Sequence, residues 1–121
     1  MKKTLVIGAT DNPSRYAYRA AHMLKEHGYE MVPVGIKKGT VAGEEILNLR
    51  ESPAVEAVDT LTLYLGPRNQ PEYYNYLLSL KPKRIIFNPG TENPELDKLA
   101  RAQGIETEEA CTLVLLSTHQ Y

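Results

Sequence analysis

The sequence predicts an α/β fold: a single doubly wound parallel sheet of about five strands, with helices on both of its faces. Three observations support this prediction. Short apolar runs alternate along the chain with segments of helical period, the connections between them carry Gly, Pro and Asn, and the chain has 121 residues. Alternating strands and helices are typical of parallel sheets, and this length suits one hydrophobic core.

The first strand and helix have the clearest signals. Residues 4–8 form an apolar run that ends at a glycine, as in a buried strand. Residues 13–27 follow as a helix, for which Asn12 can serve as the N-cap and Pro13 as the first helical residue. Gly28 ends this helix. Its apolar face is Ala17, Ala20, Ala21 and Leu24.

The middle of the chain contains two more strands and one segment that the pattern leaves open. Residues 31–35 are a second apolar run, followed by a loop rich in Gly and Lys at residues 37–43. Residues 44–49 suit either a short strand or one helical turn. Leucines alternate with Thr and Tyr over residues 58–65, which indicates a third strand with one less apolar face.

The last part of the chain repeats the alternation. We expect a helix over residues 70–80, a strand over 84–87, a helix over 93–103 that starts with a second Asn-Pro pair, a brief strand over 105–107 and a closing helical segment over 110–117. Such alternation implies right-handed crossovers, so the fold is predicted to be Rossmann-like. No linker or repeat divides the chain, which predicts one domain over residues 1–121.

Composition narrows the classes of function. The formal net charge is −1, so no basic excess favours nucleic acid or an anionic membrane as a partner. No apolar run reaches the roughly 18 residues of a membrane span, and the first residues lack a signal-peptide pattern. A single cysteine excludes an internal disulfide and a cysteine-based zinc site. These features predict a cytoplasmic protein with no metal site.

The carboxyl ends of the predicted strands carry the candidate binding residues. Ligands of open parallel sheets bind at this edge, near the point where the strand order reverses. A strand that turns sharply into a helix also directs free N–H groups and a positive dipole toward one place, which suits phosphate. The candidates are Gly8, Ala9, Thr10, Asn12, Pro13, Ser14, Arg15, Gly35, Ile36, Lys37, Leu65, Gly66, Asn88, Pro89 and Gly90.

The residues after the second strand disfavour NAD as the ligand. Domains that prefer NAD place an acid near this point to hold the ribose hydroxyls, whereas this chain has Lys37 and Lys38 there. The first loop also lacks the complete G-x-G-x-x-G pattern. Lys37 and Lys38 indicate a ligand with a phosphate on its ribose. The alternative is that they lie in an ordinary solvated loop and contact no ligand.

No catalytic constellation is evident, so we expect binding without catalysis. Cys111 is followed by apolar residues and has no recognisable base, which is typical of a core cysteine. Two alternatives remain open: an NAD(H)-sensing module of the same fold, and thiol chemistry at Cys111.

Taken together, these motifs resemble the small stand-alone CoA-binding proteins, which are similar to the nucleotide-binding domain of the succinyl-CoA synthetase α subunit. The resemblance extends over nearly the whole chain. Its motifs are residues 6–15, residues 24–34, Gly43, Asp59, residues 88–93 and residues 104–106 leading to Cys111. The chain departs from the family at Gly35-Ile36, where Asn-Pro is common, and at Asn88, where Gln is frequent.

The resemblance implies coenzyme A or an acyl-CoA as the ligand. It implies that the first loop and helix start hold the pyrophosphate, that Lys37 lies near the adenosine 3′-phosphate, and that the ends of the third and fourth strands line the groove. The synthetase's phosphorylated histidine belongs to a domain outside this resemblance, so ligase activity is not implied. We expect no nucleic-acid partner, and a homo-oligomer or a protein partner remains open.

Overall fold

The computed structural model describes residues 2–121 and contains a six-stranded sheet in which all neighbouring strands pair in parallel. The strand order is β5-β2-β1-β6-β7-β8. This order reverses between β1 and β6, which makes their carboxyl ends the switch point of the sheet. The strands are β1 (Lys3–Ile7), β2 (Glu30–Gly35), β5 (Leu47–Asn48), β6 (Thr60–Leu63), β7 (Arg84–Phe87) and β8 (Glu106–Glu109).

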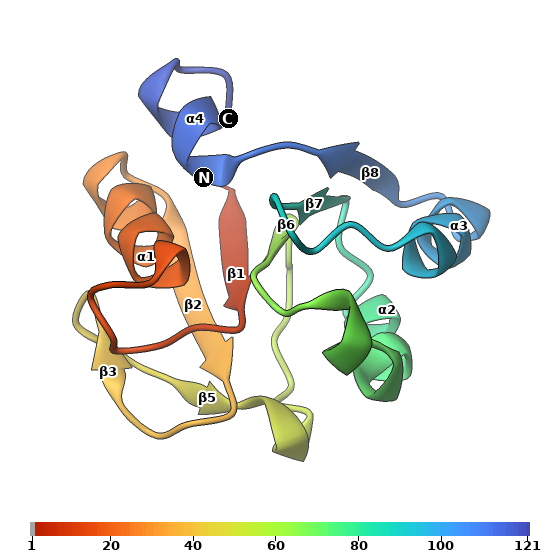
Figure 1. Ribbon diagram of the computed structural model, residues 1–121, viewed down its shortest axis with the longest axis horizontal. Coiled ribbons are helices and arrows are strands. Elements are labelled where there is room, and N and C mark those ends of the chain that lie inside the picture. The colour runs from red at the N-terminus through yellow and green to blue at the C-terminus, as the bar shows by residue number, and fades with distance from the viewer. Residues whose placement is uncertain (1) are drawn as a thin grey trace.

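Helices cover both faces of this sheet, as the sequence predicts (Figure 1). Helices α1 and α4 pack on one face, and α2 and α3 pack on the other. The helical elements are α1 (Tyr16–Glu26), η1 (Leu49–Glu51), η2 (Pro67–Asn69), η3 (Pro71–Tyr73), α2 (Tyr74–Ser79), α3 (Pro94–Ala102) and α4 (Thr112–Ser117). A separate hairpin of β3 (Thr40–Val41) and β4 (Glu44–Glu45) lies beside α1. None of the helices within residues 2–121 combines the length and the apolar character that a membrane span requires.

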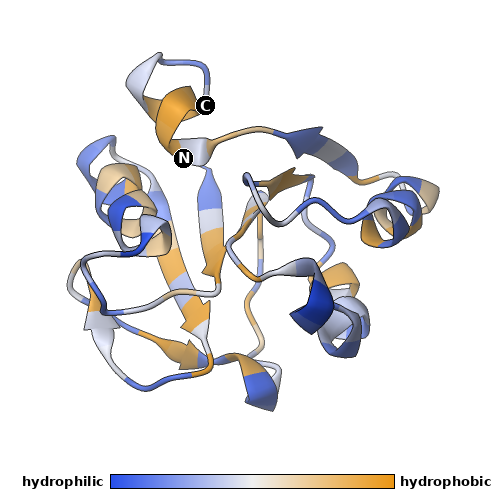
Figure 2. Ribbon diagram, in the orientation of Figure 1, coloured by the Kyte–Doolittle hydropathy of each residue, from blue (hydrophilic) through white to orange (hydrophobic). Residues whose placement is uncertain are grey.

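The parallel register places apolar side chains in rows across the central strands. Leu5 pairs with Leu61, and Leu61 pairs with Ile85, so one row of the core runs through β1, β6 and β7. All three side chains are fully buried against the α2 and α3 face. Figure 2 shows the contrast between apolar β7 and hydrophilic β8, which is an edge strand. Charged edge strands resist pairing with other molecules.

The opposite face of β6 is polar but fully buried, which explains its alternating sequence. The Thr62 hydroxyl contacts the Thr112 hydroxyl of α4 at 2.7 Å and accepts a hydrogen bond from the Asn88 side chain at 2.7 Å. Asn88 also donates to the Leu63 carbonyl and accepts from the Thr112 amide. This chain of hydrogen bonds joins α4 to the sheet beside the apolar contacts of Leu115 and Leu116.

The structure confirms the five predicted strands and supplies a sixth. Residues 44–49, left open by their pattern, form β4 and then β5, which extends the sheet beside β2. The helix predicted over residues 70–80 begins instead with a 3₁₀ turn, and its α-helical part is only Tyr74–Ser79. Asn93 caps α3 as expected, since its side chain accepts hydrogen bonds from the amides of Glu95 and Leu96.

The predicted start of the first helix is wrong by three residues. Helix α1 begins at Tyr16, its N-cap residue is Arg15, and Pro13 lies outside it. The Asn12 side chain instead accepts hydrogen bonds from the amide and hydroxyl of Ser14, at 3.0 and 2.8 Å. Asparagine closes such a local turn as readily as it caps a helix, so the sequence pattern does not separate the two outcomes.

Candidate functional site

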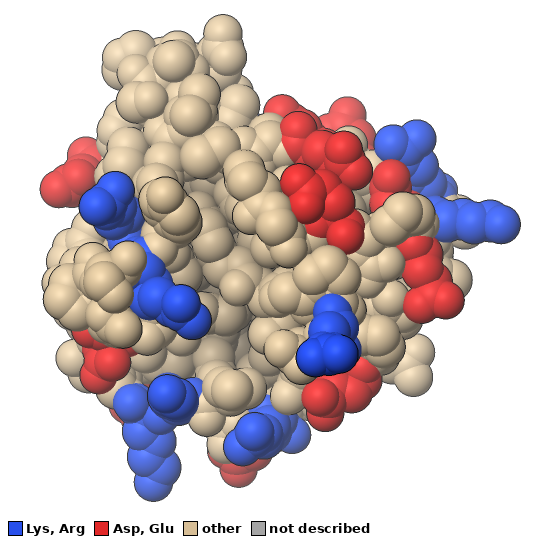
Figure 3. Space-filling view, viewed as in Figure 1, with Lys and Arg blue, Asp and Glu red and all other residues tan. Residues whose placement is uncertain are grey.

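An open groove of about 710 Å³ lies at the carboxyl ends of β1, β2, β6 and β7. This is the switch point at which ligands of doubly wound sheets bind. Figure 3 shows the hollow near the middle of this face, with basic side chains along its left and lower margins and acidic ones gathered at the upper right. The groove is lined by Gly8, Ala9, Thr10, Asp11, Asn12, Arg15, Tyr16, Ala17, Ile36, Lys37, Leu49, Tyr64, Leu65, Gly66, Asn69, Pro89, Gly90 and Thr91.

Two glycines let the first loop lie flat against the ends of its neighbouring strands. A Cβ built on Gly35 would collide with the backbone carbonyl oxygen of Ala9. Gly8 has φ +97°, and a Cβ there would lie 2.9 Å from the Tyr64 carbonyl carbon. Only glycine therefore permits this close backbone approach. The loop is fixed by the amides of Gly8 and Ala9, which both donate to the Val34 carbonyl at 2.8 and 3.1 Å.

The hydrogen bonds of the first loop determine which of its amides remain for a ligand. The amides of Gly8 and Ala9 bond to Val34, and those of Asn12, Ser14 and Arg15 are used within the loop. Within residues 2–121, no hydrogen bond uses the N–H groups of Thr10, Asp11, Tyr16 or Ala17. The last two are the first residues of α1, whose dipole adds positive potential there. These four amides are the donors available to an anion in the groove.

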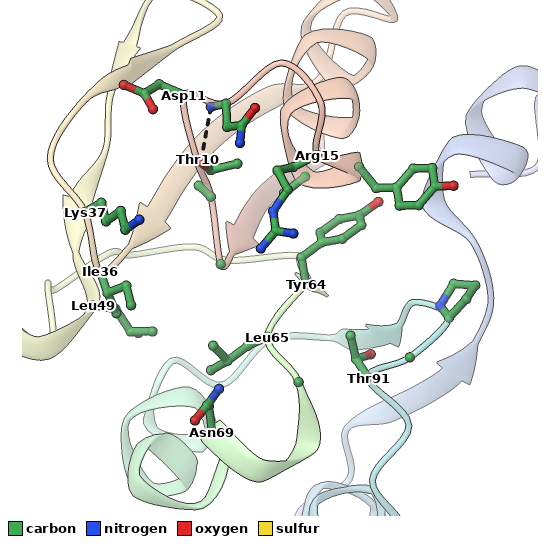
Figure 4. A pocket seen from close by; sticks show the side chains of 18 residues that line it. Thr10, Asp11, Arg15, Ile36, Lys37, Leu49, Tyr64, Leu65, Asn69 and Thr91 are labelled. Carbon is green, nitrogen blue, oxygen red and sulfur yellow. Dashed lines mark hydrogen bonds between the residues drawn. The ribbon is translucent and has the colours of Figure 1, made fainter.

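Two cations and one acid frame the groove. The Arg15 side chain points from the start of α1 toward its centre, and Lys37 lies on the β2 side beside Ile36 and Leu49 (Figure 4). Asp11 is the single acidic residue among the lining residues. The segment that follows β2, residues 36–43, contains no acidic residue, and it begins with Ile, Lys and Lys. The arrangement suits a ligand with several phosphates and an apolar part beside Ile36.

Most of the residues predicted from the sequence line this groove. They are Gly8, Ala9, Thr10, Asn12, Arg15, Ile36, Lys37, Leu65, Gly66, Pro89 and Gly90. The structure places the other four beside it. Pro13 and Ser14 lie at the exposed tip of the first loop, Gly35 packs beneath Ala9, and Asn88 is 1% exposed with its amide bonded to β6 and α4.

Seven lining residues are not among the candidates from the sequence, and of these Tyr64 has the most distinctive environment. Its position in an alternating strand gives no signal for a ligand site. The ring borders the groove, while the hydroxyl is buried and has no hydrogen-bond partner within residues 2–121. Burial, reinforced by the nearby Cys111 thiol, raises the pKa of Tyr64 above its ordinary value. The other six are Asp11, Tyr16, Ala17, Leu49, Asn69 and Thr91.

Cys111 is half-buried at the N-cap position of α4, and it is not among the residues that line the groove. Within the described residues, no group of three or more His, Cys, Asp or Glu side chains could hold a metal ion.

Comparisons with known proteins found a family model and solved structures that match most or all of the chain. A family model described as a CoA binding domain matches residues 2–117. An uncharacterized protein of known crystal structure is 58% identical over the whole chain, with 98% of its own chain covered and a TM-score of 0.96. The protein cell-free ID.343 from Thermus thermophilus is 27% identical, with 99% and 90% of the two chains covered and a TM-score of 0.86.

A more distant neighbour shares the fold alone. It is the dinucleotide forming acetyl-coenzyme A synthetase 1 of Ca. Korarchaeum cryptofilum, solved with phosphate and ADP. The identity is 16%, the TM-score is 0.71, and the match covers 90% of this chain and 25% of that one. No curated protein sequence matches the chain.

Proposed function

Because this chain belongs to the CoA-binding domain family, we propose that it binds coenzyme A or an acyl-CoA in the groove at the carboxyl ends of β1, β2, β6 and β7. The observation that carries the proposal is the set of four unused amides, at Thr10, Asp11, Tyr16 and Ala17, beside the Arg15 guanidinium. A pyrophosphate needs several donors and positive potential at one place.

The two ends of the groove suit the two ends of this ligand. Lys37 is the cation after β2, so it pairs with the 3′-phosphate of the adenosine, and Ile36 offers the base an apolar surface that is 46% exposed. The opposite end, between Leu65 and Thr91, then receives the pantetheine arm. The absence of an acid over residues 36–38 removes the usual partner of an unphosphorylated ribose, which disfavours NAD(H).

The proposal involves binding alone. The groove offers no nucleophile with an adjacent base among its lining residues, and we derive no catalytic step from it. A CoA carrier or sensor needs only the amides and cations named above.

Titration calorimetry with CoA, dephospho-CoA and NAD tests this function. We expect CoA to bind more tightly than dephospho-CoA, because only CoA carries the phosphate that Lys37 contacts, and NAD to bind most weakly. A clear preference for NAD or NADH would favour the sensing module instead. Equal binding of all three nucleotides, or of none, would contradict the proposal.

A further inference from the structure

Two loops that line the groove are joined by one buried side chain. Gln70 is fully buried, and its amide group donates to the Leu65 carbonyl at 2.8 Å and to the Thr91 carbonyl at 2.9 Å. The first carbonyl belongs to the loop after β6 and the second to the loop after β7. Gln70 itself does not line the groove. It therefore links the two walls from behind.

Asn93 fixes which way the Gln70 amide points. The Asn93 side-chain oxygen accepts from the amides of Glu95 and Leu96 at the start of α3, so its nitrogen must face the other way. That nitrogen donates to the Gln70 side-chain oxygen at 2.9 Å. The Gln70 nitrogen is consequently directed at the two loop carbonyls, and every side-chain polar atom of the pair has a partner.

Packing alone gives these loops little support at their glycines. A Cβ on Gly66 or on Gly90 would meet no atom within 4 Å apart from its chain neighbours. Both glycines line the groove, together with Leu65, Asn69 and Thr91 of the same walls (Figure 4). The two hydrogen bonds from Gln70 connect one wall directly to the other.

We propose that Gln70, oriented by Asn93, is a positioning residue that holds the walls of the pantetheine end of the groove at the spacing the ligand needs. This inference rests on the proposed function, since it assigns the Leu65–Thr91 end to the arm of CoA that carries no phosphate. The phosphate contacts of Arg15 and Lys37 lie on other loops. A change in the spacing of the walls should therefore weaken the binding of the pantetheine arm and leave the binding of the phosphates unchanged.

Two substitutions test the proposal in different ways. Gln70→Met keeps the length of the side chain and removes both donors. Asn93→Asp keeps the helix cap, but its carboxylate repels the Gln70 oxygen, so the Gln70 amide turns over and presents oxygen to the two carbonyls. Tyr74→Phe is the matched control, because the Tyr74 hydroxyl hydrogen-bonds to Asn93 and Glu95 and to neither loop.

The readout is calorimetric affinity for CoA and for adenosine 3′,5′-bisphosphate, which lacks the pantetheine arm. We expect Gln70→Met and Asn93→Asp to weaken CoA binding about tenfold, the size of two hydrogen bonds, and to change bisphosphate binding by less than about twofold. Tyr74→Phe should leave both affinities unchanged. Selective loss in Asn93→Asp supports the proposal even if Gln70→Met fails to fold.

The outcomes separate this inference from the function on which it rests. Equal weakening of both ligands would show a general loss of structure and overturn the positioning role. Unchanged CoA affinity in both variants would overturn it too. Failure of the wild-type protein to bind CoA would overturn the proposed function and this assignment together.

Discussion

Replacement of Gly35 by alanine is the substitution whose effect the structure determines most fully. The new Cβ would collide with the Ala9 carbonyl oxygen, a backbone atom that cannot rotate away. The first loop must then move off β2, and this movement breaks the two hydrogen bonds from Gly8 and Ala9 to the Val34 carbonyl. Two such bonds contribute about 1 kcal/mol each, and overpacking adds about 1–3 kcal/mol.

We therefore expect Gly35→Ala to lower the free energy of unfolding by about 3–5 kcal/mol, which for a domain of this size corresponds to a fall in Tm of roughly 12–20 °C. CoA affinity should fall as well, because the loop carries the amides of Thr10 and Asp11. Urea unfolding and thermal denaturation measure the first effect, and calorimetry measures the second.

Gly66→Ala is the matched control for this experiment. Gly66 also lines the groove, but its φ is −62° and a Cβ there would meet nothing within 4 Å. This variant should be as stable as the wild type or up to about 1 kcal/mol more stable, since alanine restricts the unfolded chain. If Gly35→Ala were as stable as Gly66→Ala, the close approach of loop and strand would not be the constraint described above.

Three further substitutions test separate parts of the account. Lys37→Ala should weaken CoA binding about fivefold at low salt, because an exposed charge pair contributes ~1 kcal/mol, and it should leave the affinity for dephospho-CoA unchanged. Equal loss of affinity for both ligands would contradict the contact between Lys37 and the 3′-phosphate. Tyr64→Phe should be at least as stable as the wild type near pH 7, because it removes a buried hydroxyl that has no hydrogen-bond partner within residues 2–121. Folded Tyr64 keeps a proton that the unfolded chain releases above about pH 10, so the wild type loses up to ~1.4 kcal/mol per pH unit more than the variant there; a gap in urea stability that stays constant from pH 8 to 11 would argue against this. Asn88→Asp should lower the free energy of unfolding in urea by about 2–4 kcal/mol, because the side chain no longer donates to Thr62 and to the Leu63 carbonyl. A variant as stable as the wild type would show that these hydrogen bonds contribute little.

The alternation of strands and helices was predictable from the sequence because the central strands are buried, and buried strands appear in the sequence as short apolar runs. It was weaker where short segments depend on their neighbours. β5 has two residues, and it is a strand only because the end of β2 lies beside it. At the start of α1, Asn12 had two local hydrogen-bonding options of similar quality, and the sequence does not rank them.

The candidate site was predictable where it depends on the backbone and unpredictable where it depends on side-chain direction. Loop glycines and lysines after the strands indicated the edge of the sheet at which the groove lies. The sequence predicts Asn88 as a ligand contact, yet its side-chain amide is hydrogen-bonded to Thr62, Leu63 and Thr112 inside the fold. Tyr64 looks like a core residue and borders the groove. Cytoplasmic location stays a prediction.

The measurement that tests the central claim most directly is an amide ¹H–¹⁵N NMR titration of the protein with CoA. The account predicts that the largest shifts fall on the unused amides of Thr10, Asp11, Tyr16 and Ala17. Smaller shifts should follow at Gly66 and Gly90, where the pantetheine arm lies. Shifts centred elsewhere on the surface, or no shifts at millimolar CoA, would contradict it.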